Sequence, residues 1–178
     1  MIKTIYFGGG CFWCVESIYL KLKGVVNVKP GYMGGSTIKP TYEEVCEGNT
    51  NHVEVAKVVY NETIKLNDLL KVFFSIHDPT TLNRQGADVG TQYRSAIFCE
   101  ISDRAEIIDF IKTIEKMAVY KDNIVTEVNE VVDFYEAEEY HHNYFNNNPE
   151  NSYCEIVVSP KIKKFQDNFS SLISKQNS

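Results

Sequence analysis

The chain has 178 residues, of which 43% are hydrophobic, and a formal net charge of −6. This length fills one hydrophobic core, so we expect a single domain over residues 1–178. The acidic balance, with no basic stripe, argues against nucleic acid or an anionic membrane as a partner. The chain begins directly with a strand-like segment, which leaves no room for a signal peptide, and no apolar run is long enough to span a membrane. We therefore expect a cytoplasmic protein.

The first segment carries the strongest chemical signal. Residues 2–7 are typical of a short buried strand, the glycines at 8–10 of a sharp turn, and residues 15–20 of a helix. Cys11 therefore lies near a helix N-terminus, where free backbone N–H groups and the helix dipole favour a thiolate. This arrangement predicts a reactive thiol, although a buried cysteine that packs as a small apolar residue is the commoner case.

The rest of the chain mixes strands and helices. Apolar periodicity predicts strands over residues 24–28, 52–60, 95–101, 124–128 and 154–158. It predicts helices over residues 42–46, 66–76, 104–117, 137–145 and 160–173. Residues 29–35 and 78–93 have the composition of loops. Because the two kinds of element alternate irregularly and several strands are amphipathic, we expect an α+β fold with a two-layer sandwich instead of a doubly wound parallel sheet.

Cys11 and Cys14 form a C-x-x-C pair. Residues three apart share one helix face, so a disulfide between them is geometrically reasonable. Taken alone, the pair favours a dithiol oxidoreductase, with a cysteine hydrolase that pairs Cys11 with a histidine as the second reading. A zinc site would need two more ligands, and the remaining cysteines and histidines contain no second tight thiol pair, so no metal is expected.

Two polar segments are candidates for the same site. Glu54 points inward if its neighbours Val53 and Val55 face the other side of their strand, and otherwise it is a solvated glutamate. Residues 88–95 place many hydrogen-bonding side chains at the end of a long loop, and long ordered loops are usually functional. The alternative for this loop is a plain turn capped by Asp88.

Several motifs resemble, in order and with compatible spacing, those of the methionine sulfoxide reductase A family. They are Gly10-Cys11-Phe12-Trp13, Tyr42, His52-Val53-Glu54-Val55, Asp88-Val89-Gly90-Thr91-Gln92-Tyr93-Arg94-Ser95, Ala137-Glu138-Glu139-Tyr140-His141 and Tyr153-Cys154. The similarity runs from the first strand to the last helix. It implies a ferredoxin-like core with extra elements and long loops. It also implies reduction of the S epimer of free and protein-bound methionine sulfoxide, a repair of oxidative damage.

The resemblance implies a role for each candidate residue. The Cys11 thiolate attacks the sulfoxide sulfur and becomes a sulfenic acid. Glu54 supplies a proton to the sulfoxide oxygen, which requires a carboxyl group whose pKa is raised by apolar surroundings. Tyr42 and Tyr93 donate hydrogen bonds to that oxygen while it carries negative charge.

Three further residues complete the implied site. Phe12 and Trp13 form an apolar cup for the S-methyl group of the substrate. Asp88 supports the Tyr93 segment and an ordered water beside the thiol. The substrate is therefore expected to lie in a shallow, partly aromatic depression.

Turnover needs a second thiol to remove the sulfenic acid. Many relatives have glycine at the position of Cys14 and recycling cysteines in a C-terminal tail, but here no cysteine follows Pro160. Cys14 and Cys154 remain as candidates, and we favour Cys14 because it is closer along the chain. The resemblance implies that a dithiol carrier, thioredoxin, reduces the disulfide through a transient contact, so no metal and no bound cofactor is expected. We also expect a monomer.

Overall fold

The computed structural model describes residues 1–175. Its strands are β1 (Ile2–Gly8), β2 (Val25–Met33), β3 (Val53–Asn61), β4 (Arg84–Gln85), β5 (Asp88–Val89), β6 (Ala96–Cys99), β7 (Glu127–Glu130) and β8 (Phe134–Glu136). Its α-helices are α1 (Phe12–Tyr19), α2 (Tyr42–Cys46), α3 (Leu66–Ile76), α4 (Ile101–Lys116), α5 (Tyr144–Asn147) and α6 (Ser159–Asn168). Within this part of the chain, no helix is both long and apolar enough to cross a membrane.

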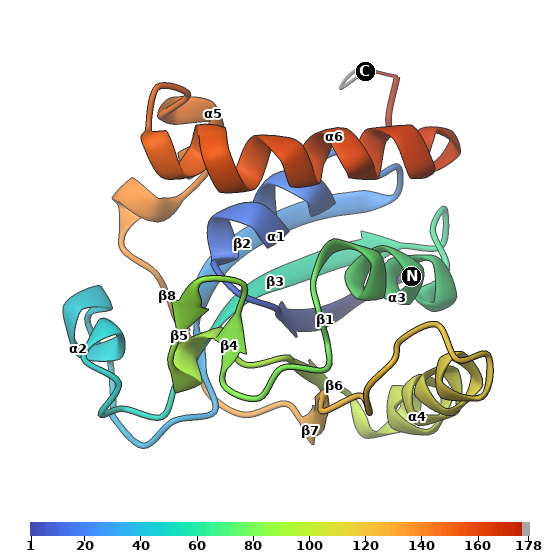
Figure 1. Ribbon diagram of the computed structural model, residues 1–178, viewed down its shortest axis with the longest axis horizontal. Helices are drawn as coiled ribbons and strands as arrows, with labels where there is room; N and C mark the ends of the chain where they lie inside the picture. Colours follow the sequence, from blue (N-terminus) through green and yellow to red (C-terminus); the bar gives the residue numbers. More distant parts are fainter. Residues whose placement is uncertain (176–178) are drawn as a thin grey trace.

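Six strands form the central sheet, in the order β7-β6-β1-β3-β2-β8 (Figure 1). All neighbours pair antiparallel except β6 and β7, which are parallel. The four inner strands, with α1 between β1 and β2 and α3 between β3 and β6, give the β-α-β-β-α-β order of a ferredoxin-like fold. The expected α+β class is confirmed.

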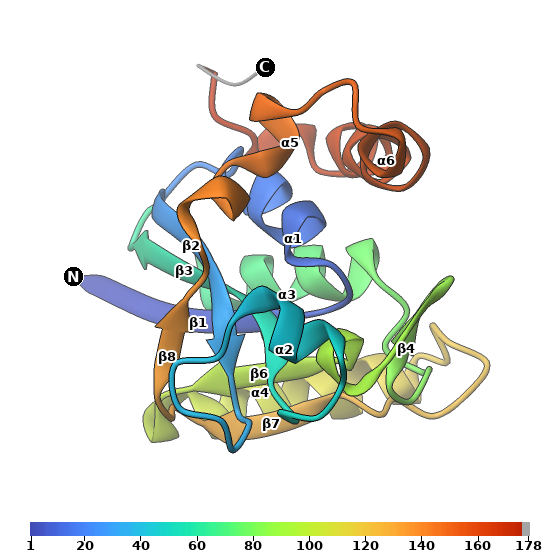
Figure 2. The same ribbon diagram turned by 90° about the vertical axis from the view of Figure 1, so that its left-hand side faces the viewer.

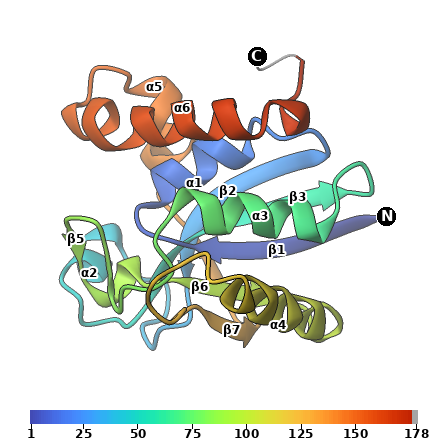
Figure 3. The same ribbon diagram turned by 45° about the vertical axis from the view of Figure 1, so that its right-hand side comes forward.

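Side chains that alternate along the strands fall into two separate apolar clusters. In β1, Ile5 and Phe7 belong to the main core, which also includes side chains from α1, α3, α4 and α6, whereas Tyr6 belongs to a smaller cluster. This follows from the period of two in a strand, which sends successive side chains to opposite faces. Figure 3 shows α6 lying over α1, with α4 at the other side of the molecule near β7. Because side chains of α1, α3 and α4 share the main core with the sheet, these helices form the second layer of the predicted sandwich, and α6 packs on α1 and α3.

Two predicted loops contain regular structure. Residues 29–33, expected in a loop, continue β2 because this segment pairs with both β3 and β8. Gly31 is essential to that packing, since a Cβ there would lie 2.3 Å from Cε2 of the Phe134 ring. Within residues 78–93 the structure has the β4–β5 hairpin and a 3-10 turn at Thr91–Tyr93.

The sequence-based boundaries fail most clearly after residue 120. The strand expected over residues 154–158 is a π-helical turn, Cys154–Val158, that runs directly into α6. Its short apolar run did not distinguish strand from helix, and packing of Cys154 and Val158 into the core selects the helix. The helix expected over residues 137–145 is split into a 3-10 turn and α5, and β8 was not predicted at all.

The remaining elements follow the sequence closely. The helix predicted over residues 66–76 is α3, and the short helix predicted over residues 42–46 is α2. Thr41 caps α2 through a reciprocal pair of hydrogen bonds with Glu44. At one end of the sheet, α2 and the β4–β5 hairpin lie on the side from which α1 begins (Figure 2).

Candidate active site

Antiparallel pairing brings Glu54 to the start of α1. Phe7 pairs with Ala56, so the chain that leaves β1 passes beside the beginning of β3. Val53 and Val55 belong to the smaller apolar cluster, and Glu54, with 1% of its surface exposed, points to the opposite, helix-bearing side. The backbone N–H of Phe12 donates a hydrogen bond to Glu54 Oε1 at 3.3 Å. Of the two orientations that the sequence left open for Glu54, the structure has the inward one.

The glycine turn places Cys11 at the N-cap of α1. Gly10 has a φ of +86°, and a Cβ on it would lie 2.7 Å from Cγ of Gln85. A Cβ on Gly9 would lie 3.0 Å from the ring Cγ of His77. A side chain at either position would push the turn away from the loop behind it. The sharp turn predicted between strand and helix is confirmed, with Cys11 as the residue that precedes the helix.

The thiol of Cys11 is less acidic than its place at a helix start predicts. Burial raises its pKa well above the ordinary value, and Glu54 and Cys14, whenever they are ionised, act in the same direction. The backbone N–H of Trp13 opposes them by favouring the thiolate. The helix terminus is thus outweighed by desolvation, and in the resting structure Cys11 is a protonated thiol.

Glu54 also keeps its proton at neutral pH. Burial raises the pKa of this carboxyl group to about 8, against a smaller lowering effect from the Phe12 N–H group. A carboxyl group with this pKa is able to donate a proton near neutral pH, as general acid catalysis requires. Beside Cys11 there is therefore an acid that can protonate an oxygen bound at the same place.

Tyr42, the first residue of α2, and Tyr93, in the 3-10 turn at Thr91–Tyr93, both lie near Glu54. Both phenol pKa values are raised, first by burial and then by neighbouring groups that include Glu54. Both hydroxyls therefore remain protonated donors. Tyr42 is held through its backbone N–H, which donates to Glu138 Oε2 at 3.0 Å, while the Tyr32 hydroxyl donates to Glu138 Oε1 at 3.0 Å.

The role of Glu138 in this arrangement was not predicted. The residue lies in one of the resemblance motifs, but its spacing from Tyr42, 96 residues away, carries no signal in a single sequence.

Phe12 and Cys11 belong to one aromatic cluster, against which Trp13 packs. Phe12 is fully buried against Tyr32 and the ring of His141. Trp13 is half-buried, and its Nε1 donates a hydrogen bond to His141 Nδ1 at 3.0 Å. Tyr153 lies with its ring edge toward Trp13, at 5.8 Å between centroids. This apolar surface can accommodate a methyl group.

Asp88 has a partner that the sequence did not indicate. Its Oδ2 accepts a hydrogen bond from the hydroxyl of Tyr153 at 2.5 Å, which joins β5 to the segment before α6. Its negative charge also lies close enough to raise the pKa of Tyr93 and of Glu54. The structure therefore brings Asp88 to the same site, with Tyr153 as an additional residue.

All five cysteines are free. Cys14 donates its backbone N–H to the carbonyl of Cys11 at 3.2 Å, and a turn closed in this way brings the two Cα atoms within about 7 Å. Cys154 is buried at 0% exposure in the main core with Cys14, whereas Cys11 belongs to the aromatic cluster. The electrostatic neighbours of Cys14 include Cys154 as well as Glu54. Cys14 is thus close to Cys154 as well as to Cys11.

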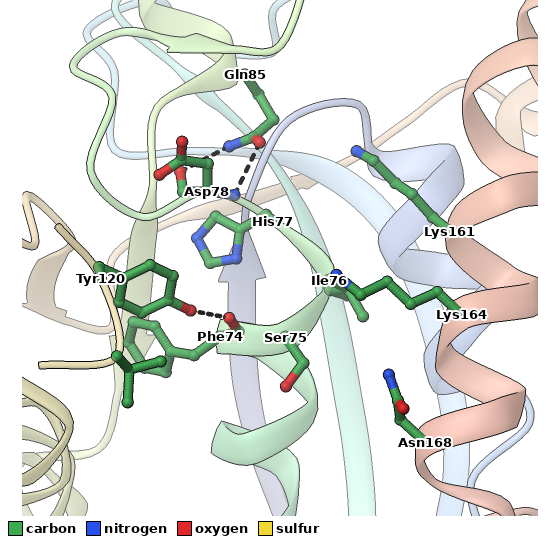
Figure 4. Close-up of a pocket in the computed structure, with 11 residues that line it drawn as sticks. Phe74, Ser75, Ile76, His77, Asp78, Gln85, Tyr120, Lys161, Lys164 and Asn168 are labelled. Atoms are coloured by element: carbon green, nitrogen blue, oxygen red, sulfur yellow. Dashed lines mark hydrogen bonds between the residues drawn. The ribbon is translucent and has the colours of Figure 1, made fainter. Parts of the chain in front are cut away.

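A separate cavity of about 590 Å³ lies between the end of α3 and α6, behind the glycine turn (Figure 4). His77, Gln85, Lys161 and Lys164 are among the residues that line it, but neither Cys11 nor Glu54 is. The Gln85 amide exchanges two hydrogen bonds with the backbone of Asp78, at 2.8 and 2.9 Å. These contacts support the turn from behind, so we place the reaction at the aromatic cluster around Cys11 and not in this cavity. Among residues 1–175, no group of three metal-binding side chains comes together.

Comparisons with known proteins identify the family to which the chain belongs. A family model described as peptide methionine sulfoxide reductase matches residues 3–173. The peptide methionine sulfoxide reductase MsrA of Trichodesmium erythraeum is 48% identical over 176 residues, which cover 98% of this chain and 99% of the relative. That of Saccharolobus solfataricus is 49% identical over 170 residues, covering 94% and 95%.

Two solved structures are also similar. Reduced Mxr1 from Saccharomyces cerevisiae superposes with a TM-score of 0.80 at 38% identity, covering 86% of this chain and 89% of that one. Methionine sulfoxide reductase A of Corynebacterium diphtheriae gives 0.72 at 35% identity, covering 83% and 76%. Fold and site thus define a thiol-dependent oxidoreductase. The chain belongs to the peptide methionine sulfoxide reductase family, and its similar curated relatives are of the A type.

Proposed function

We propose that this enzyme reduces the S epimer of methionine sulfoxide, free or within oxidised proteins, and so repairs oxidative damage. The observation that carries this function is the pairing of a buried cysteine with a protonated carboxyl group. Cys11 lies at the start of α1, and Glu54, whose pKa is about 8, accepts a hydrogen bond from the next residue. Oxygen removal from a sulfoxide needs a nucleophile and an acid side by side.

In the first step, the sulfur of Cys11 attacks the sulfoxide sulfur while Glu54 gives its proton to the sulfoxide oxygen. Tyr42 and Tyr93 stabilise the charge on that oxygen until it is protonated. Collapse gives the thioether of methionine and a sulfenic acid on Cys11, so one sulfur is reduced and the other oxidised by two electrons. Because burial keeps Cys11 protonated at rest, its own proton leaves during the attack and restores Glu54.

Phe12 and Trp13 bind the S-methyl group in this proposal, and the depression that they line supplies no charge to compete with the oxygen side. Asp88 acts through its hydrogen bond with Tyr153 and its closeness to Tyr93. A sulfoxide enters with its methyl group toward the aromatic rings and its oxygen toward Glu54. This placement selects one configuration at sulfur.

Cys14 is the preferred resolving thiol. It attacks the sulfenic sulfur of Cys11, a disulfide forms, and water leaves. Two observations support Cys14 over Cys154: the tight turn that joins Cys14 to Cys11, and the burial of Cys154 in the main core, outside the cluster that contains Cys11. A dithiol carrier of the thioredoxin type then reduces the disulfide. All these groups come from one chain, so the enzyme acts as a monomer without metal or bound organic cofactor.

The test uses L-methionine sulfoxide of both epimers with dithiothreitol as reductant. The wild-type enzyme should consume the S epimer only, and Cys11→Ser should abolish the reaction. A dithiol oxidoreductase would instead reduce small disulfides with no need for a sulfoxide. A cysteine hydrolase would cleave esters or amides without any reductant. Either result, with no sulfoxide consumed, would overturn the proposal.

The resolving thiol is tested by mass spectrometry after one equivalent of sulfoxide. A Cys11–Cys14 disulfide is expected, and Cys14→Ser should leave the sulfenic acid to accumulate or to react with Cys154. Cys99→Ser is the matched control, because Cys99 is buried like Cys14 but lies in β6, where its charged neighbours, Asp103, Arg104, Glu100 and Glu130, do not belong to the site. A Cys11–Cys154 disulfide in the wild type, with Cys14 free, would reverse our assignment.

A further inference from the structure

Glu16 is a buried carboxyl group that the proposed chemistry does not use. It lies in α1 with only 2% of its surface exposed. It is three residues after Trp13, a spacing that puts the two side chains on neighbouring positions of one helix face. A buried carboxyl group is costly unless its oxygens accept hydrogen bonds, so its partners indicate what it does.

Those partners belong to a segment far away in the sequence. The carboxyl group of Glu16 accepts hydrogen bonds from the backbone N–H groups of Asn143 and Tyr144, at the start of α5. Asn143 has a φ of 53°, a left-handed conformation that is costly for residues other than glycine. None of the four residues of α5 is fully buried, although Tyr144 and Phe145 pack against the main core. Glu16 is therefore the polar tie between α1 and α5.

The same segment provides contacts on two sides of Trp13. The Tyr144 ring stacks on the indole, with 3.8 Å between centroids and an interplanar angle of 6°. The Trp13 Nε1 group donates its hydrogen bond to His141 Nδ1, at 3.0 Å. Because Trp13 is only half-buried, the main core does not enclose it. Its orientation thus depends on where residues 141–144 lie.

We propose that Glu16 is a positioning residue of the substrate cup: by holding Asn143 and Tyr144, it fixes the indole of Trp13 in the orientation that receives the S-methyl group. This inference rests on the proposed function, since it assigns a purpose to the cup. Glu16 touches neither the substrate nor the reacting sulfur. Loss of the tie should therefore weaken substrate binding more than it slows the chemical step.

The experiment takes advantage of Trp13, which is the single tryptophan of the chain. In Glu16→Ala, we expect the tryptophan emission of the folded enzyme to shift to longer wavelength and acrylamide quenching to increase. With methionine sulfoxide and dithiothreitol, KM should rise about tenfold while kcat changes much less, a factor equal to about 1.4 kcal/mol. Glu16→Gln keeps an acceptor oxygen and should restore most of both properties.

The matched control is Glu115→Ala, which makes the same change at an exposed glutamate of another helix, α4. It should leave emission, quenching and KM unchanged. If Glu16→Ala does not fold, Tyr144→Leu removes the stacked ring while it leaves Glu16 intact, and the same shift in emission and KM is expected.

A folded Glu16→Ala variant with wild-type emission and quenching would overturn the proposal, even if its thermal stability were lower. So would equal losses in Glu16→Gln and Glu16→Ala, because the acceptor oxygen would then be irrelevant. The fluorescence needs no substrate. A wild-type protein that reduced no sulfoxide would overturn the proposed function, whereas the emission of the variants would still show whether Glu16 fixes the indole.

Discussion

At the scale of single residues, Glu54 links the chemistry to pH. Its pKa of about 8 means that the proposed proton donor is lost as the pH rises through that value. We therefore expect the single-turnover rate of sulfoxide reduction to fall above about pH 8. Glu54→Gln should lower the rate by about 10²- to 10⁴-fold, the usual range for a missing general acid, and should remove this alkaline decline. An identical decline in the Gln variant would mean that another group is titrating.

The same residue should make the active enzyme less stable than an inactive variant. Burial raises the pKa of Glu54 from 4.5 to about 8, so the unfolded chain releases this proton from about pH 4.5 upward while the folded chain holds it. Stability is therefore lost between these two values, by about 5 kcal/mol at most, at about 1.4 kcal/mol for each pKa unit. Glu54→Gln should avoid this loss, since glutamine does not ionise.

Urea unfolding at pH 5 and pH 8 measures this effect. Glu54→Gln should be clearly more stable than the wild type at pH 8 and close to it at pH 5. Glu115→Gln, at an exposed position, should change neither value. Equal stabilisation of the Glu54 variant at both pH values would show that the carboxyl group is not the cause.

At the scale of elements, the turn between β1 and α1 decides where the nucleophile lies. Gly10 has a φ of +86°, and the side chain of Gln85 lies so close that a Cβ added to Gly10 would be 2.7 Å from Gln85 Cγ. Gly10→Ala should cost about 1 to 2 kcal/mol of stability from the left-handed backbone alone, and more from the contact. It should also lower kcat, because relief of the contact moves Cys11 away from Glu54.

Gly48→Ala separates the two causes. Gly48 has a similar φ of +79°, but nothing lies within 4 Å of the position that its Cβ would take. This variant should lose stability from backbone strain and keep its kcat. Thermal unfolding and steady-state kinetics on both variants make the comparison, and an unchanged kcat in Gly10→Ala would show that the turn does not set the position of the thiol.

At the scale of the whole molecule, a buried histidine should make the fold sensitive to acid. His77 bonds to the Phe73 carbonyl at 2.6 Å and to Ser95 Oγ at 2.8 Å, and Ser95 Oγ lies 2.7 Å from Thr126 Oγ1. This chain joins the end of α3 to the segments that enter β6 and β7. Burial lowers the pKa of His77 from 6.5 to about 4, which keeps the ring neutral.

Below pH 6.5 the unfolded chain takes up a proton on His77 that the folded chain refuses until about pH 4. Stability is therefore present above pH 6.5 and falls by about 3 kcal/mol as the pH drops to 4. His77→Gln should lower stability at pH 7 but flatten this acid dependence, as measured by urea unfolding across that range. His142→Gln is the matched control, because it makes the same change at a histidine that is only half-buried, and this variant should keep the wild-type acid dependence.

The predictable part of the fold is the part with strong local signals. The helix at residues 66–76 and the helix at residues 42–46 have clear apolar spacing or a capping pair, and both form as predicted. Residues 29–33 do not form the predicted loop. Pro30 and Gly31 are typical of turns, but here they belong to a strand on which the ring of Phe134 packs. Likewise, the apolar run at residues 154–158 is too short for its periodicity alone to distinguish a strand from a helix.

The sequence by itself determined the glycine turn and the helix that starts after Cys11, because these follow from local conformation. Alternation along the strand left two directions open for Glu54, and packing of Val53 and Val55 into the smaller apolar cluster selected the inward one. Only the tertiary structure decided the protonation of the site. Desolvation of Cys11 outweighs the helix terminus, and this depends on what surrounds the thiol. Glu138, Tyr153 and Glu16 also make contacts between segments that are distant in the chain. Such contacts cannot be predicted from one sequence alone, because they depend on how the segments pack in the fold.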